Sequence, residues 1–374
     1  MTNKEKSEIQ KKIVDSLDLK PHGLLLLAPR IGKTRIIIDI IKKNNPKSIL
    51  WVTPSAELAT KDIPEEFTKW KAVRFKKNLT TVTWKSLNKI KGHYDLIVYD
   101  EVQFMTENSI NNFISEEITY DYIIGMTGTQ TKHENKKDLY KLLKLPILYQ
   151  LSINEAVDKG LLADYQVKVI EINLGKVKNV KAGNKDKPFF TTEEANYDYI
   201  NKTTNNAIAS GHPSLMFKIL NRMRTIYNSP SKLEVAKYLI DNLSGRKLFF
   251  CSNINQAETL SSQTYHSKSN KKHLEQFISG EIDTITMVNT GGIGFTYKDI
   301  DHLIIVQCDS DSNGNNSQKI ARTLLQQKNY KATIWVLCLV GTQDEKWIES
   351  ALENFDKTKV EYIRYKNFKL DGNK

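Results

Sequence analysis

Residues 24–34 of the chain read LLLLAPRIGKT. Four consecutive leucines without polar alternation predict a strand that is buried on both faces. Gly32, Lys33 and Thr34 then open the apolar run RIIIDIIKK, which has the length and spacing of a helix. A glycine lets the backbone approach a ligand, and a helix N-terminus offers unpaired N–H groups. The stretch therefore predicts a phosphate-binding turn, in which Lys33 contacts the β and γ phosphates and Thr34 binds Mg²⁺.

A second stretch, residues 96–103, reads LIVYDEVQ and also joins an apolar strand to polar residues. Asp100 suits the Mg²⁺ side of a nucleotide, and Glu101 suits the polarisation of an attacking water. GKT alone is a weak match, because the usual pattern has a glycine where this chain has Leu27, and a surface turn is the alternative interpretation. A solvated charge pair seldom ends a buried strand, so the two stretches together favour an NTPase.

Composition indicates a protein of two globular units. The chain has 374 residues, of which 40% are hydrophobic and 26% charged, and this length exceeds the usual size of one core. The polar N-terminus does not resemble a signal peptide, and no apolar run approaches the roughly 20 residues that span a bilayer. We therefore expect a cytoplasmic protein without a membrane span. The three cysteines lie in apolar runs without metal-binding spacing and are expected to be reduced core residues: Cys251, Cys308 and Cys338.

The net charge of +12 favours a polyanionic partner, because lysines near phosphates release counterions whatever the base sequence. General lysine usage with a well-solvated surface is the alternative explanation.

Strand and helix signals alternate along the chain, which predicts an α/β fold with parallel sheets. Ligands of open α/β sheets bind beyond the carboxyl ends of the strands, so the loops at those ends should share one crevice. We predict a first domain over 1–161, a second over 162–356 with a helical insert at about 191–242, and a tail over 357–374. The expected strands cover 24–27, 48–53, 80–83, 96–99, 122–126, 247–251, 284–288, 302–307 and 333–339.

The order of these motifs resembles that of superfamily 2 helicases and translocases (DEAD/H-like), in particular phage helicases of the UvsW type and Swi/Snf-type DNA translocases. In the first half, APRIGKT, TPSAELA, TVTWKSL, DEVQ and TGT resemble motifs I, Ia, Ib, II and III. In the second half, KLFFCSN, VNTGGIGFTYKDIDHLII and CDSDSNGNNSQKIARTLL resemble motifs IV, V and VI. The resemblance implies two RecA-like parallel-sheet domains in tandem, with ATP and Mg²⁺ in the cleft between them.

The resemblance also implies roles for individual residues. Gln10 matches an adenine-sensing glutamine, although a glutamine in a helix is more often simply solvated. Trp84, beside motif Ib, is a candidate for stacking on a base, as aromatic residues on single-strand platforms do, but a tryptophan packed on its own domain is the favoured interpretation. The implied catalytic residues are Asp100, Glu101, Gln318 and Arg322, with Thr34 and Asp100 on Mg²⁺. The implied ATP-binding residues are Gln10, Arg30, Ile31, Gly32, Lys33, Thr34, Arg35 and Gly294. The residues implied to couple the phosphate state to nucleic-acid binding are Gln103, Thr127, Gly128 and Thr129. The implied nucleic-acid-binding residues are Pro54, Ser55, Thr83, Trp84, Ser252, Asn253, Thr290 and Gly291.

The resemblance predicts an ATP-dependent DNA helicase or translocase of phage-type replication, recombination or repair, which would act in a bacterial host's cytoplasm if phage-encoded. Contacts to the phosphate backbone carry no sequence information, so little base specificity is expected. An RNA helicase is one alternative; DEVQ and the Swi/Snf-like motif V favour DNA over RNA. A nucleotide-gated clamp or loader with weak ATPase activity is another, because Leu325 replaces the second arginine of motif VI.

Overall fold

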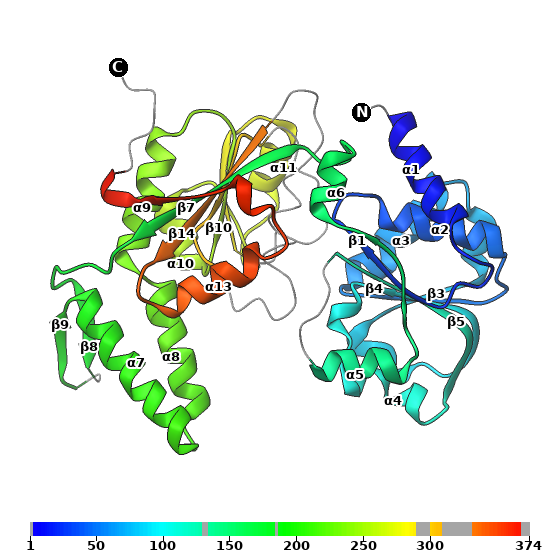
Figure 1. Cartoon of the computed structure of the whole chain (residues 1–374), viewed down its shortest axis with the longest axis horizontal. Helices are drawn as coiled ribbons and strands as arrows, with labels where there is room; N and C mark the ends of the chain where they lie inside the picture. The colour runs from blue at the N-terminus through cyan, green and yellow to red at the C-terminus, as the bar shows by residue number, and fades with distance from the viewer. Residues whose placement is uncertain (1–2, 129–133, 184–185, 289–299, 309–330, 368–374) are drawn as a thin grey trace. The chain divides into compact units, whose positions relative to one another are not determined.

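The computed structural model describes residues 3–128, 134–183, 186–288, 300–308 and 331–367. These residues form two compact units, and the chain passes from the first to the second between Asp164 and Tyr165 (Figure 1). No helix within these ranges is long and apolar enough to cross a membrane. All three cysteines are buried, as expected from the apolar runs that contain them.

The first unit contains a six-stranded sheet with the order β3-β2-β4-β5-β1-β6. Every neighbouring pair of strands in it is parallel. All five residues of β1 are buried, as the run of leucines predicts. The strands are β1 (Gly23–Leu27), β2 (Ile49–Thr53), β3 (Leu79–Thr83), β4 (Gly92–Asp100), β5 (Ile118–Thr127) and β6 (Ile147–Leu151).

Helices connect these strands. The helix after β1 buries five isoleucines, which explains why the run RIIIDIIKK folds as an amphipathic helix against the sheet. The helices are α1 (Asn3–Asp15), α2 (Lys33–Asn44), α3 (Ile63–Lys69), α4 (Glu107–Ile114), α5 (Glu134–Leu142) and α6 (Ile153–Asp158). Short turns of helix are η1 (Leu58–Asp62), η2 (Val73–Asn78), η3 (Trp84–Lys89) and η4 (Val102–Phe104).

The second unit contains a seven-stranded sheet with the order β11-β12-β10-β13-β14-β7-β15. The strands from β11 to β14 pair in parallel, and β15 is parallel to β7. The expected α/β architecture with parallel sheets is thus confirmed. The strands are β7 (Asp164–Ile172), β10 (Lys247–Cys251), β11 (Thr264–Tyr265), β12 (Thr284–Val288), β13 (His302–Ile305), β14 (Lys331–Leu339) and β15 (Val360–Arg364).

The remaining elements that the structure describes in the second unit are helices, helical turns and one hairpin. β15 and two helical turns, η6 (Lys357–Lys359) and η7 (Tyr365–Asn367), lie in the segment 357–374 that was predicted to be a tail. The helices are α7 (Glu193–Ser210), α8 (Leu215–Tyr227), α9 (Pro230–Asn242), α10 (Ile254–Leu260), α11 (Lys272–Ser279) and α13 (Gln343–Leu352). The hairpin consists of β8 (Val180–Gly183) and β9 (Pro188–Thr191).

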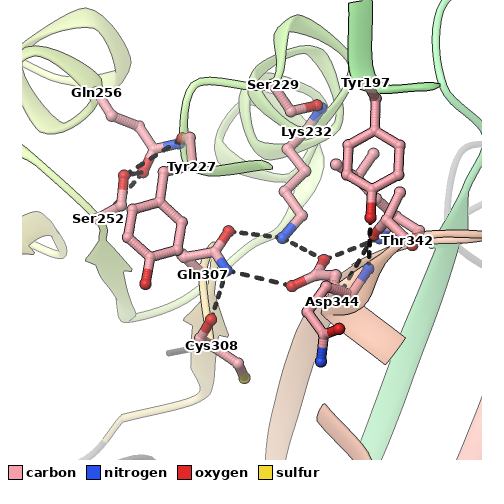
Figure 2. Close-up of polar contacts among 12 residues, drawn as sticks. Tyr197, Tyr227, Ser229, Lys232, Ser252, Gln256, Gln307, Cys308, Thr342 and Asp344 are labelled. Carbon is pink, nitrogen blue, oxygen red and sulfur yellow. Dashed lines mark hydrogen bonds and ion pairs between the residues drawn. The ribbon is translucent and has the colours of Figure 1, made fainter. Parts of the chain in front are cut away.

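A buried ion pair lies at the carboxyl edge of the second sheet (Figure 2). Lys232 of α9 and Asp344 of α13 are both fully buried, with Nζ and Oδ2 2.5 Å apart. Gln307, just after β13, joins both: its Oε1 accepts from the lysine at 2.8 Å, and its Nε2 donates to Asp344 Oδ1 at 3.2 Å. Asp344 also accepts from the backbone N–H of Leu339 at 2.9 Å. The cluster thereby fixes the starts of two helices to the ends of two strands.

The ion pair generates a stability prediction. Replacement of Lys232 by methionine removes the cation that compensates the buried Asp344 carboxylate. We expect Lys232→Met to lower the free energy of unfolding by about 3–5 kcal/mol, measured by urea denaturation. Lys237→Met, at an exposed position of the same helix, is the matched control and should change it by less than about 0.5 kcal/mol. Equal effects of the two substitutions would contradict this role for the pair.

Candidate nucleotide-binding site

The turn after β1 has the backbone shape of an anion-binding loop. Arg30 and Gly32 have positive φ angles of 68° and 89°, whereas Ile31 between them does not. Such alternation turns successive N–H groups toward one side and forms a concavity suited to an anion. Gly32 is the N-cap of α2 and supplies no side-chain cap, so the first N–H groups of the helix receive no bond from it. Leu27, where the usual pattern has glycine, is the fully buried last residue of β1.

Helix α1 supports this turn from the side. Gln10 is 2% exposed and donates from Nε2 to the carbonyl oxygen of Ile31 at 2.7 Å. Lys6, one turn earlier on the helix, donates to the carbonyl of Arg30 at 2.8 Å, and burial lowers the pKa of this lysine. The interpretation of Gln10 as a solvated glutamine is therefore wrong. Its Oε1 is buried without a hydrogen-bond partner in the described part of the chain, so it remains an acceptor.

Arg35 makes its contacts within the first unit. Its Nη1 donates to the hydroxyl of Ser7 at 2.8 Å, and its Nε lies 3.7 Å from an Asp39 carboxylate oxygen. The guanidinium carbon lies 4.4 Å from the ring centroid of Trp70. These contacts suit an arginine that joins α1, α2 and α3, while its predicted contact with ATP stays a prediction.

The carboxylates after β4 lie within reach of the phosphate-binding turn. Asp100 is the last residue of β4, and Glu101 follows it with φ 50°. Glu101 Oε1 lies 3.1 Å from the Nζ of Lys33, and both side chains are less than one-sixth exposed. The other oxygen of Glu101 accepts from Gln103 Nε2 at 2.9 Å. The fold thus brings Lys33 together with Glu101, which is 68 residues away in sequence, and with its neighbour Gln103.

The end of β5 completes this edge. Thr127 is buried, and the α-carbon of Gly128 faces Pro29 so closely that an added Cβ would touch the proline ring at 3.4 Å. Lys136 of α5 donates from Nζ to the carbonyl oxygen of Gln103, and burial lowers the pKa of this lysine. Sequence reasoning missed Lys136, as it missed Lys6 and Ser7, because none of them belongs to a motif.

Among the predicted nucleic-acid contacts, Trp84 has a clear position. It is 6% exposed, its ring centroid lies 5.0 Å from that of Tyr99, and its Nε1 donates to the carbonyl oxygen of Asp100 at 3.0 Å. This geometry favours the packing interpretation over base stacking. Thr83 of the same turn donates from its hydroxyl to Ser86 Oγ at 3.1 Å.

The other predicted contacts lie in loops after strands. Pro54 and Ser55 follow β2, and the carbonyl of Ser55 accepts from the Thr53 hydroxyl at 2.8 Å. In the second unit, Asn253 caps α10 by accepting from the N–H of Gln256 at 2.9 Å. Neighbouring Ser252 donates to the carbonyl oxygen of Tyr227 at 3.3 Å (Figure 2). Six predicted site residues lie outside the described residues: Thr129, Thr290, Gly291, Gly294, Gln318 and Arg322.

The chain is similar in sequence and fold to known helicases and translocases. No protein-family model matches the chain. It is 21% identical over 384 residues to the DNA 3'-5' translocase XPB2 of Sulfurisphaera tokodaii, with 91% of this chain and 83% of that protein covered. The Pyrococcus furiosus Hef helicase domain matches with a TM-score of 0.51 at 14% identity, covering 92% of this chain and 97% of that one. The chain has the fold of a superfamily 2 helicase core.

A third similar structure is that of S. cerevisiae Dbp5 bound to RNA and ADP BeF3, with a TM-score of 0.57 and 12% identity. The match covers 96% of this chain and 89% of the Dbp5 chain. The resemblance to superfamily 2 helicases seen in the sequence is thereby confirmed. The predicted motifs I, Ia and II begin at or directly after the last residues of β1, β2 and β4, motif Ib spans the end of β3, and Thr127 and Gly128 of motif III lie at the end of β5. All of these positions are at the carboxyl edge of the first sheet.

The support of the turn by Gln10 can be tested with a double-mutant cycle. A Cβ at Gly32 would meet Gln10 Nε2, and the φ of 89° is itself unfavourable for alanine by about 1–2 kcal/mol. We expect Gly32→Ala to reduce the free energy of unfolding by more than Gly280→Ala, whose φ is 84° and whose added Cβ meets no atom within 4 Å. In a Gln10→Ala background the two costs should become equal. An unchanged excess cost at Gly32 in that background would contradict the contact.

Proposed function

We propose that this chain is a nucleic-acid-stimulated ATPase that moves along or remodels DNA. The observation that carries the proposal is the contact between Lys33 and Glu101 at the edge where the strands of the first sheet end. A phosphate-binding lysine and a carboxylate beside it are the two charges needed to hold a triphosphate and activate a water. The similarity to XPB2, a DNA 3'-5' translocase, supports DNA as the substrate.

The residues of the first unit fit a nucleotide with its metal ion. The alternating backbone of Arg30 to Gly32 and the uncapped start of α2 offer N–H groups to phosphates. Thr34 lies in the first turn of α2, and Asp100 ends β4; a hydroxyl and a carboxylate oxygen are ligands that Mg²⁺ accepts. The unpartnered Oε1 of Gln10 can accept from the amino group of adenine. The metal supplies charge neutralisation of the β and γ phosphates when it is bound.

In the proposed mechanism, Lys33 exchanges partners. Its ammonium group contacts the Glu101 carboxylate at 3.1 Å, and the γ-phosphate of ATP competes for the same ammonium. When Lys33 turns to the phosphate, Glu101 loses its cation and becomes a better acceptor for a proton of the attacking water. Gln103 holds one oxygen of Glu101 through its 2.9 Å hydrogen bond, so the carboxylate keeps its orientation when Lys33 turns away. The exchange links binding of the triphosphate to readiness for hydrolysis.

This exchange predicts opposite effects of two substitutions on ATP affinity. Lys33→Ala removes the phosphate contact and should abolish both ATP binding and hydrolysis. Glu101→Gln removes the competing charge, so it should abolish hydrolysis while binding ATP about 5-fold more tightly, which corresponds to about 1 kcal/mol for a partly buried pair. Fluorescence titration with a labelled ATP measures affinity, and phosphate release measures turnover. Lys42→Ala, on the same helix, is the control, and weaker ATP binding by Glu101→Gln would contradict the exchange.

The proposed function also predicts which nucleic acid activates the ATPase. We expect ATP turnover to rise in the presence of duplex or single-stranded DNA, and to rise less with RNA of the same sequence. The effect should fall as salt is raised, because contacts to phosphates release counterions. The Dbp5 structure with RNA makes RNA the alternative polymer, and stronger stimulation by RNA would support an RNA helicase. Equal turnover with and without every polymer would contradict the proposal.

A further inference from the structure

An insert in the second unit carries features that the nucleotide site does not use. It covers residues 176–228 and contains the β8–β9 hairpin and the helices α7 and α8, so it differs from the expected helical insert at about 191–242 by including the hairpin and leaving out α9. The two helices pack against each other, and Figure 1 shows the hairpin lying beside α7. Its base is fixed to the start of α13: Tyr197 of α7 accepts through its hydroxyl from the N–H of Gln343, next to the buried Asp344 (Figure 2). The insert is therefore a firmly attached projection of the second unit.

A groove of about 1180 Å³ lies on this insert. The hairpin contributes Lys181 and Phe189 to its lining, α7 contributes Tyr199, and α8 contributes Asn221 and Arg224. All three elements of the insert thus face the same groove. Its walls combine two cations, two aromatic rings and the amides of four asparagines.

The charge of the groove suits an anion. From 176 to 228 the sequence holds nine Lys and Arg residues against four Asp and Glu residues. The one carboxylate of the lining, Glu193, is 2% exposed and accepts from the hydroxyls of Ser229 and Ser231. Within the described ranges, neither Lys181 nor Arg224 forms an ion pair, and both side chains are exposed. Two unneutralised cations therefore line the groove beside a carboxylate that is already satisfied.

The aromatic side chains of the groove are unusually open to solvent. Phe189 is 57% exposed and Tyr199 is 70% exposed, so much of each ring is available to a ligand. Exposed rings beside cations are the arrangement with which proteins bind single-stranded nucleic acid, because every base offers a flat face for stacking and the backbone offers phosphates. A duplex hides the faces of its bases within the stack and offers no such face to Phe189 or Tyr199.

We propose that this groove binds a single strand of nucleic acid, with bases on Phe189 and Tyr199 and phosphates at Lys181 and Arg224. The inference deepens the proposed function and rests on it, since it adds a second strand contact to the same chain. A protein partner is the competing occupant. For a protein, the exposed apolar residues at the far end of the helical pair, Met216 and Phe217, would be expected to contribute, yet neither lines the groove.

The test measures binding of a fluorescein-labelled oligothymidine to the full chain by anisotropy at several salt concentrations. Tyr199→Ala and Phe189→Ala should each weaken binding about 5- to 150-fold, the effect of one lost base stack, without changing the salt slope. Tyr199→Phe keeps the ring and should bind as the parent does. Arg224→Ala and Lys181→Ala should each reduce the slope of log K against log salt by about 0.7.

Phe217→Ala is the matched control, because it removes an exposed ring outside the groove. Parent-like affinity and slope in all groove variants would overturn the inference, and so would an equal loss in Phe217→Ala, which indicates general apolar binding. Strand binding does not require hydrolysis, so it is also measured in a Lys33→Ala background. Strand binding that depends on the groove in a chain without stimulated ATPase activity would refute the proposed function alone. Stimulated activity with parent-like groove variants would refute this inference alone.

Discussion

Parallel strand pairing is the constraint on which the candidate site depends. In the first sheet every neighbouring pair is parallel, so the carboxyl ends of all strands meet at one edge. The sheet therefore carries the polar ends of β1 and β4 to the same place, although β5 lies between these strands. Lys33 and Glu101 meet there at 3.1 Å without any local sequence relation. If β1 or β4 ran in the opposite direction, one of the two groups would lie at the opposite edge of the sheet.

This constraint explains why so much was predictable from sequence. A parallel strand covered on both faces is apolar throughout, so runs such as 24–27 and 96–99 stand out and are confirmed as strands. The residues that follow each run then define the edge. The strand over 360–364 was not predicted. It lies at the edge of the second sheet, and its residues VEYIR are largely exposed. An edge strand needs little apolar surface, so composition did not distinguish it from a tail.

Contacts between elements were not predictable in the same way. The position of Gln10 depends on where α1 docks, and only the fold shows that its amide reaches the carbonyl of Ile31. Trp84 follows a strand as a base-contacting residue would, yet its indole N–H meets the carbonyl of Asp100 and holds the ring inward. The pairing of Lys232 with Asp344 joins two helices far apart in sequence. In each case the sequence shows the type of side chain but not its partner, because the partner depends on how the elements pack.

In the second unit, a buried ion pair fixes the positions of helices relative to the strands. Removing two charges from water is costly, and an apolar pair of similar volume would often be at least as stable, so stability alone is a poor reason for such a pair. The contacts of the pair indicate that it positions the surrounding helices and strands. Lys232 contacts both Gln307 and Asp344, which fixes where the chain leaves β13 relative to α9 and α13. Ser229, one turn before Lys232, also bonds Glu193 at the base of the insert. The same short stretch of α9 therefore sets the position of the sheet edge and of the insert that carries the groove.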